Sequence, residues 1–114
     1  MLKPVFIMFN LFLWASSAQA FHLCTDIRAV VVRGAEMLIE GQEETAIDEM
    51  IAAKMQAHGH MDTPALRGAM LRQSLKMSRK IADSDLRQMT AVNYFGDQFH
   101  TECTRNKIWS GIGH

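Results

Sequence analysis

Apolar residues recur at steps of three and four from about position 25 to position 103, with charged and polar residues between them. This spacing brings the apolar side chains onto one stripe of an α-helix, so it predicts a series of amphipathic helices. Val30, Val31 and Val32 form the one strand-like stretch of the sequence, and it is too short and too isolated to indicate a sheet. The pattern therefore predicts an all-α fold.

The first two helices are delimited by residues typical of helix ends. The first is expected over residues 25–40, because Gly41 is a natural C-terminal stop. The second is expected to begin at Thr45 as the capping residue, with Asp48 completing an approximate capping box, and to end at Gly59. The apolar stripes of these two helices are Ile27, Val30, Val31, Ala35 and Leu38, and Ile47, Met50, Ile51 and Met55.

Two further helices follow. The third has Asp62 or Thr63 as its cap and Pro64 at its first position, where the missing N–H costs no hydrogen bond. The fourth is expected to be capped by Asp83 or Ser84. Because the links are short, the four helices should pack as a compact antiparallel bundle. Their apolar stripes are Leu66, Met70, Leu71, Leu75, Met77 and Ile81, and Leu86, Met89, Val92, Phe95, Phe99 and Cys103.

The first twenty residues have the layout of a secretory signal peptide. Lys3 supplies a positive start, residues 5–15 are apolar except for Asn10, and residues 18–20 read Ala-Gln-Ala, a typical cleavage site. The apolar run is far shorter than the roughly 20 residues that a membrane-spanning helix needs. We therefore expect residues 1–20 to be removed on export.

The mature chain is then a single helical domain over residues 21–114, periplasmic or secreted. Lipid attachment at Cys24 is disfavoured, because bulky residues precede it rather than the small ones that a lipoprotein needs. No membrane anchor is expected after cleavage. The C-terminal tail has two glycines and no helical period, and we expect it to be loose, with Trp109 packing back on the bundle.

Cys24 and Cys103 lie near the two ends of the mature chain. An even pair of cysteines in a small exported protein most simply forms a disulfide, and in an up-down-up-down bundle these two helix ends lie on the same side. The alternative is a zinc site, since His22 and His100 would converge with the two thiols. We expect the disulfide.

A second group of possible metal ligands lies between the second and third helices. Met55, His58, His60 and Met61 combine thioethers and imidazoles, which are suited to copper. Against this stands a simpler interpretation, in which Met55 belongs to the buried stripe and the histidines form a polar turn. Both alternatives remain open from the sequence.

Charge is balanced over the whole chain, with 12 basic and 12 acidic residues, so neither nucleic acid nor an anionic membrane is indicated as a partner. Locally, an acidic segment precedes a basic one. Both can be solvated faces, or they can pair inside the bundle; alternatively they form a bipolar surface that steers an unknown protein partner or self-association. The residues of this candidate surface are Glu43, Glu44, Arg67, Arg72, Lys76, Arg79 and Lys80.

The chain also resembles known proteins in its layout. Cys24 opens the first helix, and the last helix ends in a Phe-x-x-x-Cys pattern from Phe99 to Cys103. In this it resembles a group of small exported bacterial all-helical proteins with one N-to-C-terminal cysteine pair. It is also similar in layout to helical immunity proteins, which guard the periplasm against injected cell-wall amidases, and to small periplasmic acid-stress chaperones with one disulfide.

Catalytic motifs are absent from the sequence: it contains no His-Glu-x-x-His, Gly-x-Ser-x-Gly, Ser-x-x-Lys or phosphate-binding loop. We therefore expect a non-enzymatic protein without a cofactor that acts by binding another protein, in an immunity, inhibitor or envelope-stress role. The alternative is a periplasmic copper- or zinc-binding protein.

Overall fold

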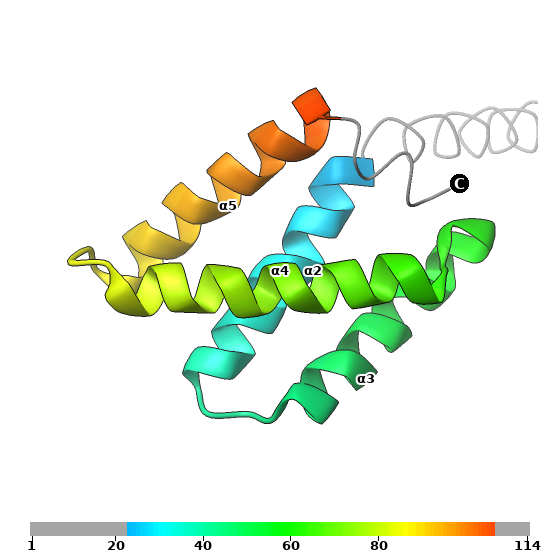
Figure 1. Ribbon diagram of the computed structural model, residues 1–114, viewed down its shortest axis with the longest axis horizontal. Coiled ribbons are helices and arrows are strands. Elements are labelled where there is room, and N and C mark those ends of the chain that lie inside the picture. Colours follow the sequence, from blue (N-terminus) through cyan, green and yellow to red (C-terminus); the bar gives the residue numbers. More distant parts are fainter. Residues whose placement is uncertain (1–22, 107–114) are drawn as a thin grey trace, which may run out of the picture.

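The computed structural model describes residues 23–106, and in this range the chain is helical with short connections. Consecutive α-helices run in opposite directions, and α4 crosses α2 in the middle of the molecule (Figure 1). This arrangement confirms the all-α, antiparallel prediction. The elements are α2 (Leu23–Ile39), α3 (Glu44–Met55), the 3₁₀ segment η1 (Gln56–Met61), α4 (Pro64–Asp83) and α5 (Gln88–Asn106).

The expected signal peptide (residues 1–20), His22 and Trp109 lie outside the described residues. Between residues 23 and 106, no helix combines the length and the apolar character needed to cross a membrane.

Gly41 ends α2 as its position in the sequence predicts. Its φ is +92°, a left-handed conformation that glycine adopts without steric cost. The N–H of Gly41 donates to the carbonyl of Leu38 at 3.0 Å, and the N–H of Gln42 donates to that of Met37 at 3.0 Å. These two bonds form a Schellman motif, which satisfies carbonyl groups at the helix end.

The predicted cap of α3 was wrong. Glu43 is the capping residue, without a side-chain cap hydrogen bond, and Thr45 lies inside the first turn. The Glu43 carbonyl accepts from the N–H of Ala46 at 3.0 Å and from that of Ile47 at 3.3 Å, so the helix is already under way at Thr45. Glu44 places a carboxylate near the positive end of the helix dipole, which favours this earlier start.

The start of α4 agrees with the sequence, but the start of α5 does not. Thr63 caps α4 by accepting a hydrogen bond from the Leu66 N–H at 3.1 Å, and Pro64 follows in the first turn. Ser84, predicted to cap the last helix, instead ends α4, and its Oγ accepts from the Leu86 N–H at 3.0 Å in the turn. Because this turn occupies residues 84–87, α5 begins only at Gln88.

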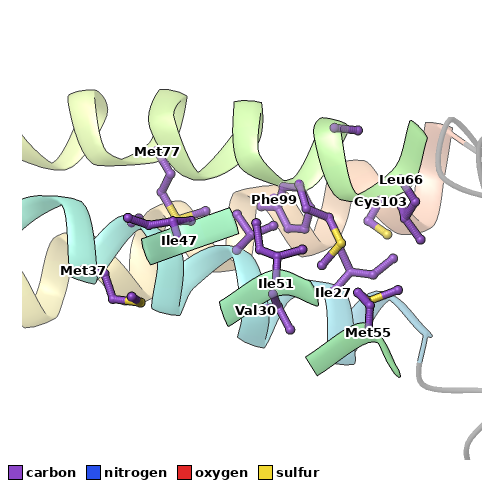
Figure 2. Packing of buried hydrophobic residues seen from close by; sticks show 14 of the residues in the cluster. Ile27, Val30, Met37, Ile47, Ile51, Met55, Leu66, Met77, Phe99 and Cys103 are labelled. Atoms are coloured by element: carbon purple, nitrogen blue, oxygen red, sulfur yellow. The ribbon is translucent and has the colours of Figure 1, made fainter. Parts of the chain in front are cut away.

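The core lies where α4 packs on α2, with α3 and α5 on either side. Figure 2 shows apolar side chains from all four α-helices converging there. One polar side chain is buried among them: Ser74, fully buried, donates its Oγ–H to the Val31 carbonyl at 3.0 Å. The buried apolar residues are Ile27, Val30, Val31, Ala35, Met37, Ile47, Ile51, Met55, Leu66, Ala69, Met70, Met77, Ile81, Ala91, Phe99 and Cys103.

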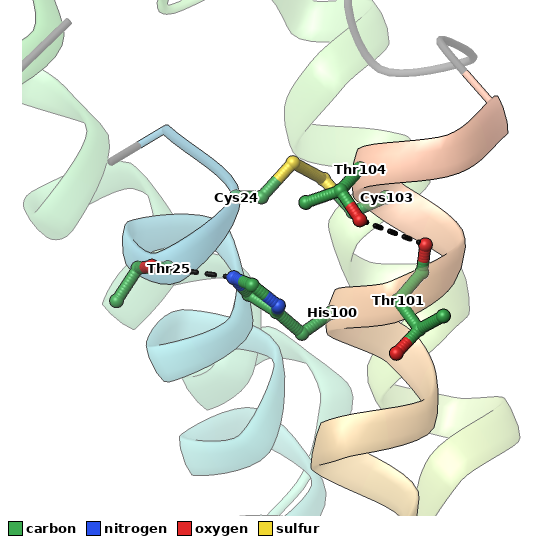
Figure 3. The surroundings of a disulfide bond; sticks show 6 residues. All are labelled: Cys24, Thr25, His100, Thr101, Cys103 and Thr104. Carbon is green, nitrogen blue, oxygen red and sulfur yellow. Dashed lines mark hydrogen bonds between the residues drawn. A yellow bond between two sulfur atoms is a disulfide. The ribbon is translucent and has the colours of Figure 1, made fainter. Parts of the chain in front are cut away.

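The predicted disulfide is present. Cys24 in the first turn of α2 is bonded to Cys103 in the last turn of α5, with 5.9 Å between the two Cα atoms (Figure 3). The bond closes a loop with a sequence separation of 79 residues. By restricting the unfolded chain, a loop of this length contributes about 4.5 kcal/mol to stability in the chain-entropy model.

Candidate functional site

The outer face of α4 carries a row of cations, which we call the basic stripe: Arg72, Lys76, Arg79 and Lys80. Their spacing of four, three and one residues keeps them on one side of the helix, over about 12 Å of its length. All are exposed, and none forms an ion pair with another described residue. The basic stripe is thus a local concentration of positive charge that forms no ion pair within the described range.

Arg67, the remaining basic residue of the predicted surface, is held differently. Its Nε and Nη2 atoms each donate to one carboxylate oxygen of Asp62 at 2.6 Å, which is a bidentate pair across the start of α4. These hydrogen bonds lower the pKa of Asp62 below its ordinary value, and desolvation opposes the effect only in part. Arg67 therefore stabilises the junction of η1 and α4, and it is not part of the basic stripe.

Glu43 and Glu44, the acidic members of the predicted surface, are exposed at the start of α3. The sequence left open whether the acidic and basic segments pair inside the bundle. Among the described residues the ion pairs are Arg28–Asp97 at 2.8 Å, Arg33–Glu40 at 3.4 Å and the Asp62–Arg67 pair. None of these joins α3 to α4, although the carboxylate of Asp48 in α3 contributes to raising the pKa of Arg67, after the larger effect of the hydrogen bonds to Asp62.

Two exposed apolar residues lie in the turn after α4 and in the first turn of α5. Leu86 and Met89, expected on a buried face, are 46% and 79% exposed because α5 begins later than predicted. Ala91 is fully buried in their place. Farther along α5, the ring of Phe95 lies 5.9 Å from Nζ of Lys80, within the range of a cation–π contact. The sequence pattern alone did not reveal this exposed apolar corner.

The possible copper ligands are distributed between the core and the surface. Met55 is 1% exposed and points into the core beside Ile27 and Ile51 (Figure 2). His58 and Met61 are half-buried in η1, which also contains His60. Using Met55 as a ligand would remove it from the core, which favours its interpretation as a packing residue. Within residues 23–106, no group of three or more His, Cys, Asp and Glu side chains could hold a metal ion.

The cysteine end of the molecule offers no thiolates. Both sulfur atoms are in the disulfide, so they are not available as ligands for zinc. His100 approaches Thr25 instead, with 3.3 Å between its Nε2 and the threonine Oγ1 (Figure 3). This contact and the disulfide both join α2 to α5, so these residues hold the two helices together.

No protein-family model, curated protein or solved structure matches this chain. The resemblance to small exported helical proteins stays a prediction. What the molecule can do is therefore inferred from its geometry and charge, and the basic stripe is its most distinctive charged surface.

Proposed function

We propose that this protein acts without catalysis, by binding the acidic surface of another protein through the basic stripe of α4. An immunity, inhibitor or envelope-stress role is the class of function that fits such a binder. The observation that carries the proposal is a set of four exposed cations that form no ion pair with a described acidic residue: Arg72, Lys76, Arg79 and Lys80.

The electrostatic argument concerns both rate and specificity. Like charges at neighbouring helix positions repel one another, so the stripe costs a few tenths of a kcal/mol per close pair in the free protein. An acidic partner surface would remove this repulsion and accelerate association, an effect that salt weakens because the charges are exposed. A cationic row of this kind therefore suits a protein partner that carries carboxylates at matching spacing.

The scaffold supports the proposal because it holds the stripe in one geometry. Leu66, Met70 and Met77 anchor the opposite face of α4 in the core. The disulfide between α2 and α5 restrains these two helices, which flank α4. A preorganised helix backbone loses little conformational entropy on binding, so this cost is confined to the long side chains of the stripe.

Export to the periplasm or beyond is part of the proposal. The disulfide supports it, because such bonds form and persist in oxidising compartments. Fractionation of cells that produce the full chain should recover a shortened protein that begins at Phe21, outside the cytosol. Recovery of the uncut chain in the cytosol, with both thiols free, would contradict this part of the proposal.

The binding proposal is tested with the fourfold variant Arg72→Gln, Lys76→Gln, Arg79→Gln and Lys80→Gln. Wild-type protein and variant are cross-linked in envelope extract, and a partner identified with the wild type is then purified and titrated at two salt concentrations. The variant should bind at least tenfold more weakly, and high salt should weaken the wild type toward the same affinity. The double variant Arg33→Gln/Lys54→Gln, which removes cations from other helices, should bind as the wild type does.

Two results would overturn the binding proposal. One is a partner whose affinity is equal for wild type, fourfold variant and control. The other is self-association: if sedimentation shows a dimer that both the fourfold variant and Glu43→Gln/Glu44→Gln abolish, the stripe serves contacts between copies of this chain. For an acidic partner, by contrast, neutralising Glu43 and Glu44 should leave binding unchanged or strengthen it.

A further inference from the structure

A hollow of about 440 Å³ lies between α2 and α3 and extends to η1. We call it the α2–α3 groove. The α2 wall presents one residue per helical turn, because Asp26, Val30 and Arg33 are spaced by four and three. The opposite wall also presents one residue per turn, with Met50, Lys54 and His58 spaced by four. The volume falls within the range of roughly 300–1,000 Å³ that small-molecule sites occupy.

The groove is hollow because its walls carry small residues where larger ones would fill it. Ala29 of α2 and Ala57 of η1 line it with one methyl group each. Val30, 8% exposed, and the half-buried Met50 supply the rest of its apolar surface. A short apolar chain lying against this surface would lose part of its contact with water, at roughly 0.8 kcal/mol for each methylene group that becomes buried.

The charged residues of the groove favour an anion. Arg33 and Lys54 are basic residues on opposing walls, and Asp26 is the one carboxylate among the described residues that line the hollow. Arg33 is 3.4 Å from Glu40, an exposed pair that holds it only weakly. Lys54 forms no ion pair with any residue of the described range, so its ammonium group has no competing partner there.

We propose that the α2–α3 groove binds a small amphipathic monoanion, an unbranched medium-chain carboxylate. Its head group would pair with Arg33 and Lys54, and its alkyl chain would lie against Val30 and Met50. This is a site separate from the basic stripe of α4, and it goes beyond the binding of a protein partner. Since the two sites share no residue, either proposal can fail without the other.

Three ligands of equal chain length test the proposal by isothermal titration calorimetry, below their micelle concentrations: decanoate, decanol and decyltrimethylammonium. Decanoate should bind at least tenfold more tightly than decanol, and decyltrimethylammonium should not bind. The double variant Arg33→Gln/Lys54→Gln should bind decanoate with an affinity at least tenfold lower than that of the wild type. The control Lys76→Gln/Arg79→Gln, which removes the same charge from α4, should stay within twofold of the wild type.

A second variant tests the location independently of charge. Ala29→Trp would fill the groove from an exposed helix position, and it should abolish decanoate binding while far-ultraviolet circular dichroism and the thermal midpoint stay close to wild type. The proposal is overturned if decanoate does not bind, or if Ala29→Trp binds it unchanged. Equal affinity for all three ligands would also overturn it, because that result indicates adsorption to apolar surface without charge selection.

Discussion

Gly34 of α2 and Ser74 of α4 pack against each other at the point where these two helices cross. A Cβ atom added to Gly34 would overlap Ser74 Oγ and would lie 2.9 Å from Ser74 Cβ and 3.2 Å from Ile47 Cγ2. The serine hydroxyl, buried by this contact, donates to the Val31 carbonyl one turn earlier in α2. The absence of a side chain at Gly34 therefore allows α4 to sit close to α2.

Replacing Gly34 by Ala should destabilise the protein by about 1–3 kcal/mol, because the added methyl group overpacks the crossing. Urea denaturation gives the free energy of unfolding. Gly68→Ala is the matched control: it lies in α4, and its added Cβ would meet only Arg72 Nη1 at 3.5 Å. There the gain in helix propensity should dominate, and we expect stabilisation by about 0.5–1 kcal/mol. Equal losses for both variants would contradict the close crossing.

The contact between Gly34 and Ser74 also predicts coupling. Ser74→Gly removes the two serine atoms that the new methyl group would meet and leaves only Ile47 Cγ2, so part of the cost of Gly34→Ala should disappear in the double variant. A double-mutant cycle should give a coupling of about 1 kcal/mol in the favourable direction. Strict additivity of the two single changes would show that the strain arises elsewhere, for instance at Ile47.

The disulfide should be a large part of the stability of this small domain. Cys24→Ser/Cys103→Ser should lower the free energy of unfolding by about 4.5 kcal/mol, because the unfolded chain regains the entropy of an open loop. Reducing the wild type with dithiothreitol should produce the same shift of the urea midpoint, and the reductant should not affect the double variant. A shift below about 1 kcal/mol would mean that the loop contributes little.

The start of α5 can be tested with neighbouring substitutions. Met89, 79% exposed, should tolerate Met89→Gln with a change of less than about 0.5 kcal/mol, as expected of a surface position. Ala91 is fully buried, so Ala91→Leu should cost about 1–3 kcal/mol through overpacking. Thermal or urea unfolding of the two variants separates them. If Met89→Gln cost more stability than Ala91→Leu, the result would favour the predicted register, in which Met89 lies on the buried face.

Acid should remove the contribution of the Asp62–Arg67 pair to the free energy of unfolding. The pKa of Asp62 is lowered in the folded state by its hydrogen bonds to Arg67, so the unfolded chain binds the proton more readily. The stabilisation is fully present above the ordinary carboxyl pKa, and it is lost as the pH falls through the lowered value. The difference in urea midpoint between wild type and Asp62→Asn should therefore shrink from pH 6 toward pH 2. The urea midpoint of Arg67→Gln should likewise approach that of the wild type as the pH falls. If either variant differed from the wild type by the same amount at every pH, protonation of Asp62 would not be the cause.

The features of the fold that could be predicted depend on interactions between residues close in sequence. The four-residue spacing of Ile27 and Val31 in α2, and of Ile47 and Ile51 in α3, determines which faces are buried. Gly41 and Thr63 act on backbone groups within a few residues of themselves. The cysteine pair follows from the direction of the helices once four of them are predicted. Such signals are carried by neighbouring residues, so helix type and the boundaries at Gly41 and Thr63 can be predicted without coordinates. The end of the second helix, expected at Gly59, was wrong, because α3 ends at Met55 and Gly59 lies within η1.

The sequence by itself thus determined an all-helical, disulfide-closed chain, and its charge pattern identified the residues of the basic stripe. Only the tertiary structure decided that Arg67 is held by Asp62 while the stripe is unpaired, that α5 starts late enough to expose Met89, and that Ala29 leaves a groove beside Arg33 and Lys54. The physical reason is that none of these features follows from helical periodicity. The Asp62–Arg67 pair and the turn before α5 are local, but they depend on backbone geometry outside the helices. The lack of ion pairs on the stripe and the volume of the groove depend on distances between helices, which the packing of segments distant in sequence sets.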